Sequence, residues 1–156
     1  MAVGRLKRGP ETELAARYAD RLSKVARPLG LHWDGIVELG EARDATGAMR
    51  REAEAAAILE RIAPGAVVVA LDERGRTFSS EAFANDLATR RDRGASHLAF
   101  VIGGPDGHGE ALRQRADALL AFGPMTWPHQ IARILLLEQL YRATTILSGH
   151  PYHRSG

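Results

Sequence analysis

The sequence predicts a single-domain α/β protein with a mainly parallel sheet flanked by helices. Two observations carry this prediction. Short continuous runs of apolar residues, typical of strands that are buried on both faces, occur at 66–71, 98–102 and 119–122. Segments with apolar residues at helical spacing lie around and between these runs. The alternation of the two kinds of segment favours parallel strands that are joined through helices.

The first half of the chain begins with a helix that starts at Pro10 and runs to about residue 27. Proline suits the first turn of a helix, and Glu11 and Glu13 complement the positive end of its dipole. The segments that follow are a weakly alternating strand at 32–39, an Ala- and Glu-rich helix at 48–62, and the buried strand at 66–71.

In the second half, Ser79 is placed to cap a helix that runs to Arg91. The segments that follow are the strand at 98–102, a short helix at 110–116, the strand at 119–122 and, after Pro128, the longest helix at 129–147. This last helix is apolar around most of its circumference, so it must be covered on more than one side. We expect a subunit interface there, with a fully internal helix as the alternative.

Composition excludes several classes of function. The chain has no cysteine, which rules out disulfides, cysteine-ligated zinc and a thiol nucleophile. No apolar run is long enough to cross a bilayer, and the N-terminus has no signal-peptide pattern, so we expect a cytoplasmic protein. Net charge is unevenly placed: residues 1–30 carry seven Lys or Arg against three Asp or Glu, and residues 31–60 carry three against seven.

The basic N-terminal segment permits binding of a polyanion such as RNA. Charge alone is more typical of a solvated helix face. The basic residues of this segment are Arg5, Lys7, Arg8, Arg17, Arg21, Lys24 and Arg27.

Three consecutive buried strands end in residues that suit a ligand site. In an open parallel sheet, ligands bind outside the carboxyl ends of the strands. The ends here are Leu71-Asp72, Ile102-Gly103-Gly104-Pro105 and Phe122-Gly123-Pro124. Glycines let a ligand approach the backbone, and Leu71, Ile102, Met125 and Trp127 could pack on a flat purine ring. Ordinary strand-to-helix turns are the alternative for each loop taken alone.

The glycine loops do not match the known phosphate-binding patterns. The run 103–107 lacks the dinucleotide fingerprint, and the chain has no Walker lysine motif. A ligand without a phosphate, such as S-adenosylmethionine, therefore fits these loops better than a dinucleotide does. A dinucleotide oxidoreductase is disfavoured for the same reason.

The segment at the end of the last helix, residues 147–154, contains two histidines, a tyrosine and an arginine. Chain ends usually carry fewer functional side chains. Tyr152 could stack on an unpaired base, and Arg142 and Arg154 could hold phosphates. His129 and His153 could accept or relay a proton near neutral pH. A surface or capping role is the default for each histidine alone, but the cluster favours function.

These loops and the tail resemble one family. The matching stretches are Ala2-Val3-Gly4-x-Leu6-Lys7, Leu71-Asp72, Ile102-Gly103-Gly104-Pro105-x-Gly107, Met125-Thr126-Trp127-Pro128-His129-Gln130 with Arg133, Glu138-Gln139-x-Tyr141-Arg142-Ala143, and Pro151-Tyr152-His153-Arg154. They resemble the RlmH family of SPOUT-class methyltransferases, which modify N3 of a pseudouridine in bacterial large-subunit ribosomal RNA. The resemblance covers almost the whole chain. Members of the family carry about half a strand before Ala2, so we expect either a short first strand or a different start here.

The resemblance implies one SPOUT domain over residues 1–156, with a trefoil knot and the cofactor site at roughly 98–156, and a homodimer. It implies S-adenosylmethionine as co-substrate without a metal, and 23S ribosomal RNA in the 70S ribosome as partner, with pseudouridine 1915 of helix 69 as target. The implied cofactor residues are Leu71, Gly103, Gly104, Phe122, Gly123, Pro124, Met125, Thr126 and Trp127. The implied tail residues, which would complete the partner subunit's site, are Tyr152, His153 and Arg154.

The resulting hypothesis is in-line attack of N3 on the methyl group, with catalysis resting mainly on positioning. His153 is the first candidate for proton acceptor and His129 the second, while Arg142 and Arg154 would favour the anionic base. Two alternatives stay open: a SPOUT methyltransferase that acts on another RNA, and a module that binds RNA or a nucleotide without catalysis.

Overall fold

The computed structural model describes residues 1–152, and in it the chain forms two structural units. The first unit consists of residues 1–5, 36–77 and 95–129, and it holds all strands of the described chain. The second unit consists of residues 6–35, 78–94 and the chain from 130 onward, and its regular elements are helices. No helix within residues 1–152 is both long and apolar enough to cross a membrane.

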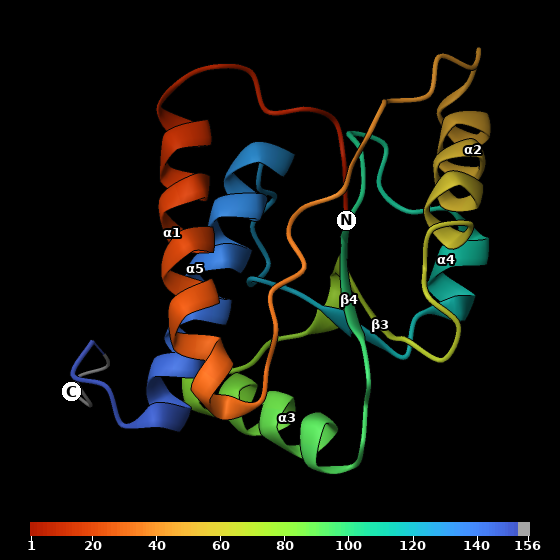
Figure 1. Ribbon diagram of the computed structural model, residues 1–156. Helices are drawn as coiled ribbons and strands as arrows, with labels where there is room; N and C mark the ends of the chain where they lie inside the picture. The colour runs from red at the N-terminus through yellow and green to blue at the C-terminus, as the bar shows by residue number, and fades with distance from the viewer. Residues whose placement is uncertain (153–156) are drawn as a thin grey trace. The chain divides into compact units, whose positions relative to one another are not determined.

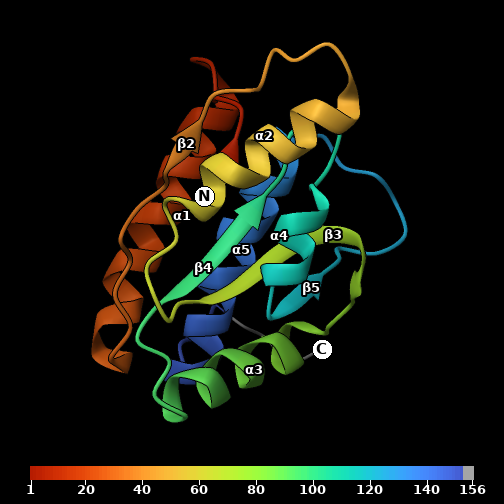
Figure 2. The same ribbon diagram turned by 90° about the vertical axis from the view of Figure 1, so that its right-hand side faces the viewer.

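The first unit contains a five-stranded sheet in the order β2-β1-β4-β3-β5, and Figure 2 shows β4 and β3 side by side in it. All four strand pairings are parallel, which confirms the predicted parallel sheet. In chain order the strands are β1 (Ala2–Val3), β2 (Glu38–Leu39), β3 (Val67–Arg76), β4 (Leu98–Ile102) and β5 (Ala118–Leu120).

Helices α2 (Gly47–Leu59) and α4 (Glu110–Arg115) lie side by side in the same unit (Figure 1, Figure 2). Thr46 caps α2, because its side-chain oxygen accepts a hydrogen bond from the backbone N–H of Met49 at 3.2 Å. The apolar faces of these helices and the sheet form one core. Its buried members are Val3, Leu39, Ala55, Ile58, Val68, Ala70, Val101 and Leu112.

The predicted strand at 98–102 is confirmed residue for residue, and the two predicted helices of this unit are confirmed within a few residues. The strand predicted at 32–39 is wrong over most of its length, because only Glu38–Leu39 pairs in the sheet. Gly35 has φ +97°, a left-handed conformation that interrupts an extended run. The strand predicted at 66–71 continues to Arg76, and the one predicted at 119–122 lies at Ala118–Leu120.

The second unit is built from α1 (Pro10–Ala26), the short 3-10 helix η1 (Arg27–Leu29), α3 (Ser80–Asp92) and α5 (His129–Ser148), which begins at the last residue of the first unit. Helices α1 and α5 lie side by side (Figure 1) and share a small core around Ala15, Ile134 and Leu137. Ser79 caps α3 as predicted, accepting a hydrogen bond from the N–H of Ala82 at 3.1 Å.

None of the residues 131–147 of helix α5 is exposed, and even Arg133, Thr144 and Thr145 are buried. The apolar residues Ile131, Leu135, Ile146 and Leu147 are only partly buried. The subunit interface expected along this helix stays a prediction.

Candidate functional site

Strands β4 and β5 end at one register, on either side of Leu71 of β3. Leu71 pairs with Ile102, the last residue of β4, and with Leu120, the last residue of β5. The prediction that a third strand also ends at Leu71-Asp72 is wrong, because β3 continues to Arg76 and pairs again with Leu120 there. The loops after β4 and β5 leave the sheet at its carboxyl edge, which is where α/β sheets bind ligands. The parallel sheet thus brings together loop segments that are separate in the sequence.

The Gly103-Gly104 turn leaves no room for side chains. A Cβ at Gly103 would lie 3.0 Å from Nδ1 of His108, and a Cβ at Gly104 would lie 2.8 Å from Oε2 of Glu54. The turn is closed by a hydrogen bond from the N–H of Gly107 to the carbonyl of Gly104 at 3.0 Å, and Gly107 has φ +82°. The main chain of this turn is held in a fixed conformation without side chains of its own.

The second loop, after β5, exposes two large apolar side chains. Met125 is 71% exposed and Trp127 is 41% exposed. Gly123 has φ +103°, so the chain turns there in a conformation that favours glycine. The remaining predicted members of this loop are Phe122, which is half-buried, and Pro124 and Thr126, which are exposed. The loop thus presents two uncovered apolar side chains that can contact a flat ring.

A buried polar group that the motif analysis did not single out supports this edge. His108 is 3% exposed, and its Nε2 lies 2.8 Å from the carbonyl oxygen of Leu71. Since a carbonyl only accepts, we assign the ring proton to Nε2, which donates to Leu71. Nδ1 is then a buried acceptor, and no group within residues 1–152 donates to it. His108 thus connects the turn after β4 to Leu71 within β3.

Asp72, the residue after Leu71, is held by two donors. Its Oδ1 accepts from the N–H of Arg74 at 3.0 Å, and its Oδ2 accepts from Nε of Arg113 at 2.9 Å. Burial alone would raise the pKa of Asp72, but these two hydrogen bonds outweigh it and hold the pKa below its usual value. Arg113 lies on α4, so this ion pair connects α4 to β3.

The buried imidazole of His108 makes the stability of the protein depend on pH. Burial lowers the pKa of His108 below its ordinary value of 6.5, although the Leu71 carbonyl and Asp72 oppose this and Arg113 adds to it. Below pH 6.5 the unfolded chain therefore takes up a proton more readily than the folded chain. Above that pH the folded protein has its full free energy of unfolding, and this free energy decreases as the pH falls further.

We expect His108→Gln to remove this pH dependence, because a glutamine amide at the position of Nε2 still donates to Leu71 and does not titrate. Between about pH 7.5 and pH 5.5 the wild-type protein should lose up to about 1.4 kcal/mol more unfolding free energy than the variant does. Urea denaturation of both proteins at the two pH values measures this difference. Parallel profiles would show that His108 takes up its proton equally well in the folded chain.

His129, a predicted proton acceptor, lies beside Gly4 at the start of α5. A Cβ at Gly4 would lie 3.0 Å from Nε2 of His129 and 3.1 Å from Oε1 of Glu41. Gly4 follows β1 and Glu41 follows β2, so His129 lies at the carboxyl edge of the sheet, where the glycine loops also lie.

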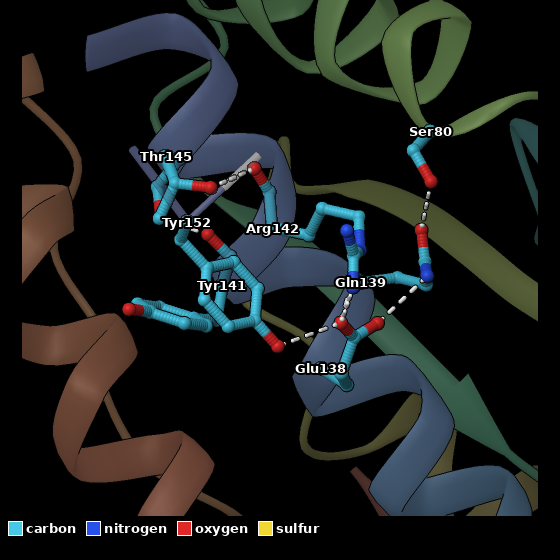
Figure 3. Close-up of polar contacts among 8 residues, drawn as sticks. Ser80, Glu138, Gln139, Tyr141, Arg142, Thr145 and Tyr152 are labelled. Carbon is cyan, nitrogen blue, oxygen red and sulfur yellow. Dashed lines mark hydrogen bonds and ion pairs between the residues drawn. The ribbon is translucent and has the colours of Figure 1, made fainter. Parts of the chain in front are cut away.

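A second polar cluster occupies α5 and the residues after it (Figure 3). Oε1 of Glu138 accepts hydrogen bonds from Nε and Nη2 of Arg142, at 2.9 and 2.6 Å, and from the hydroxyl of Tyr152 at 3.1 Å. Oε2 of Glu138 accepts from Nε2 of Gln139 at 2.7 Å, and the Gln139 carbonyl accepts from the hydroxyl of Ser80 at 2.9 Å. Glu138 is therefore the centre of a chain of hydrogen bonds that reaches from α3 to the tail.

The ring of Tyr152 packs against α5. Its centroid lies 4.7 Å from that of Tyr141 and 5.0 Å from Cζ of Arg142. Burial, a hydrogen bond with Tyr18 and the charge of Glu138 all raise the pKa of Tyr152. The phenol therefore stays protonated at neutral pH and donates to Glu138.

The paired guanidinium of Arg142 is likewise stabilised in its charged form, since the hydrogen bond to Glu138 raises its pKa. Sequence reasoning identified Arg142 and Tyr152 but gave Glu138 no role of its own. The signal that could have found it is the spacing, because a glutamate four residues before an arginine is a favoured pair on a helix. His153 and Arg154, the other two predicted tail residues, lie outside the described residues.

The parallel sheet, with glycine turns at its carboxyl edge and helices around it, defines an α/β protein. The chain belongs to the SPOUT methyltransferase family: the family model described as "Predicted SPOUT methyltransferase" matches residues 1–153. No group of three potential metal-ligating His, Cys, Asp or Glu side chains occurs within residues 1–152.

Curated relatives named "Ribosomal RNA large subunit methyltransferase H" are similar over nearly the full length. The relative from Brucella anthropi is 57% identical over 154 residues, covering 99% of this chain and 96% of the relative. Those from Brucella abortus strain S19 and Brucella ovis are 54% and 53% identical over 163 residues, with the same coverage.

Proposed function

We propose that this protein methylates N3 of a pseudouridine in large-subunit ribosomal RNA, with S-adenosylmethionine as methyl donor. The target is the nucleotide at position 1915, in the helix 69 loop of the assembled 70S ribosome. The names of the relatives support the class of RNA, and the shared tail motif supports the target. Such a substrate places the enzyme in the cytoplasm.

The observation that carries the proposal is the shared register at which β4 and β5 end, since Ile102 and Leu120 both pair with Leu71 of β3. This edge suits S-adenosylmethionine: the glycine turn presents main-chain groups for an adenine ring, Met125 and Trp127 supply an uncovered apolar surface, and nothing in the turn is built to hold a phosphate. The cofactor would be held by the residues Leu71, Gly103, Gly104, Phe122, Gly123, Pro124, Met125, Thr126 and Trp127. When bound, it supplies an electrophilic methyl group on its sulfonium sulfur.

The protein residues would position the base and accept the proton that leaves its N3. N3 of the pseudouridine carries a weakly acidic hydrogen, which has to leave before or during the attack. His153 is our first candidate to accept it and His129 the second. Arg142 and Arg154 would stabilise the negative charge on the base or hold neighbouring phosphates, and Tyr152 would contact the RNA.

We further propose that the active enzyme is a homodimer with a knotted C-terminal region, in which the tail of one subunit completes the site of the other. The support for this is the likeness of the tail and loop motifs to those of the RlmH family. Equilibrium sedimentation of the full chain would measure the dimer.

Methyl transfer from labelled S-adenosylmethionine to 70S ribosomes tests the activity. Ribosomes from a strain that lacks the modification should gain one methyl group, which mass spectrometry places on the loop pseudouridine. Naked 23S RNA and ribosomes that already carry the modification are the controls, and both should stay unlabelled. A methyl group on another nucleotide would overturn the proposed target, and cofactor binding without any transfer would overturn the proposed activity.

A further inference from the structure

A pocket lies at the other half of the same sheet edge, where β1 and β2 end. It has a volume of about 480 Å³ and is lined by Gly4, Arg5, Gly40, Glu41, Ala42 and Arg43. This size is within the range of small-molecule sites. The cofactor residues proposed above lie within β3 and after β4 and β5, and none of them lines this pocket.

Two guanidinium groups in the pocket, those of Arg5 and Arg43, have no carboxylate partner within residues 1–152. Arg5 and Arg43 are exposed, and neither forms an ion pair with any group in residues 1–152. The neighbouring Arg50, by contrast, is bound to Asp106 at 2.8 Å. An arginine fork that no carboxylate occupies is suited to a phosphate, which it can hold through two parallel hydrogen bonds.

Two glycines and one carboxylate, that of Glu41, also line the pocket. Gly4 has φ +84°, and its N–H donates to the carbonyl of Leu39 at 2.9 Å, so the backbone is fixed there. Glu41 approaches Gly4 from β2, and His129 approaches it from α5. A carboxylate disfavours a second phosphate in the same pocket, but it can accept from a hydroxyl or N–H of the nucleotide that carries the first.

The sheet order brings this pocket next to the cofactor loops. Strand β1 lies beside β4, and Ala2 pairs with Ile102. Gly4 lies two residues after Ala2, and Gly103 directly follows Ile102. A strand of RNA bound at the ends of β1 and β2 would therefore run alongside the glycine turn that follows β4.

We propose that this pocket binds one nucleotide of the substrate RNA, with a backbone phosphate between Arg5 and Arg43 and with Glu41 as acceptor for a hydroxyl or N–H of the same nucleotide. The inference rests on the proposed function, because it assigns the RNA a path across the β1–β2 half of the edge. It also gives Arg5, one residue of the basic N-terminal segment, a specific role.

The test compares the double variant Arg5→Ala/Arg43→Ala with the charge-matched control Arg61→Ala/Arg93→Ala. Arg61 and Arg93 are exposed and follow α2 and α3, and neither lines the pocket. The probe is a fluorescein-labelled RNA hairpin with a pseudouridine in its loop, and its binding is followed by anisotropy at several salt concentrations. Calorimetry measures the Kd for S-adenosylmethionine, and ribosome titrations give KM.

We expect the pocket variant to weaken hairpin binding about tenfold and to reduce the slope of log K against log salt by about 0.7–0.9, the amount for one phosphate contact. Its KM for ribosomes should rise by a similar factor, with an unchanged Kd for S-adenosylmethionine. The control should show a smaller change in each RNA measurement.

Equal RNA binding and equal ribosome KM in the two double variants would overturn the inference and leave the proposed function standing. A loss of RNA binding in the pocket variant, together with a wild-type protein that transfers no methyl group, would support the pocket and overturn the function. If the isolated hairpin binds too weakly to be measured, the KM for ribosomes still tests whether the pocket binds the RNA.

Discussion

Replacing Glu138 by alanine is expected to lower kcat/KM for ribosomes about a hundredfold and to leave the Kd for S-adenosylmethionine unchanged. Oε1 of Glu138 accepts from both Arg142 and Tyr152, two of the residues proposed to act on the RNA. Without the carboxylate, the guanidinium loses its partner and the phenol loses its acceptor. Hydrogen bonds to charged groups contribute about 1.5–3 kcal/mol, and about 2.7 kcal/mol corresponds to a hundredfold change in rate.

Two further variants separate positioning from general damage. Glu138→Gln keeps an oxygen that can accept from Tyr152 but removes the charge that holds Arg142, so we expect a loss of about tenfold. Ser80→Ala cuts the same chain of hydrogen bonds at its far end, at Gln139, and should change kcat/KM less than about threefold. Circular dichroism confirms the fold of each protein.

A Glu138→Ala protein that folds and turns over at the wild-type rate would show that Arg142 and Tyr152 do not need this acceptor. If the alanine variant does not fold, Glu138→Gln carries the same test. Equal losses in Ser80→Ala and Glu138→Gln would instead indicate that the whole network acts through stability.

The elements that sequence predicts best are those whose signals are local. The run 98–102 is apolar without a break and is followed by glycines, and the structure places β4 there. Ser79 and Pro128 mark the starts of α3 and α5 through capping and proline geometry, which depend on a few neighbouring residues.

The elements that sequence missed depend on partners far along the chain. β2 has only two paired residues, and its partner β1 lies about 36 residues earlier, so no local pattern fixes its length. The charged run at 72–76 does not look like a strand. It continues β3 because Arg76 pairs with Leu120, which also pairs with Leu71.

Some features of the candidate site could likewise be predicted from local sequence, whereas others depend on the folded sheet. Glycine and proline at strand ends predict the loops of the carboxyl edge, because these residues have distinct backbone requirements. The common register of Leu71, Ile102 and Leu120 is a property of the folded sheet and could not be predicted from composition. His108 acquires its role only from burial against the Leu71 carbonyl, and neighbouring sequence carries no sign of that contact.

Gly75→Ala is expected to lower the free energy of unfolding by at least about 3 kcal/mol and to weaken S-adenosylmethionine binding at least tenfold. A Cβ at Gly75 would lie 2.5 Å from the carbonyl carbon of Leu120 and 2.6 Å from its nitrogen. These are backbone atoms of β5, so no side-chain rotation can relieve the overlap. Overpacking of this kind typically costs about 1–3 kcal/mol or more, even where side chains can give way.

The steric overlap at Gly75 also affects the proposed cofactor loop at 122–127, because this loop follows β5. β5 is an edge strand held only by β3, and the N–H of Ala121 donates to the carbonyl of Arg76 at 3.0 Å. To make room for a Cβ, β5 must move away from β3, and Phe122 and Gly123 must move with it. Stability and cofactor affinity should therefore fall together, as urea denaturation and calorimetry would measure.

Gly40→Ala is the matched control for stability, because a Cβ at Gly40 has no atom within 4 Å and the residue does not have a positive φ. Its unfolding free energy should change by less than about 0.5 kcal/mol. If Gly75→Ala matched Gly40→Ala in stability, β5 could not pack over Gly75 as the structure has it. If stability fell while the Kd for S-adenosylmethionine stayed at the wild-type value, the loop at 122–127 would not be part of the cofactor site, since that loop begins directly after the displaced strand.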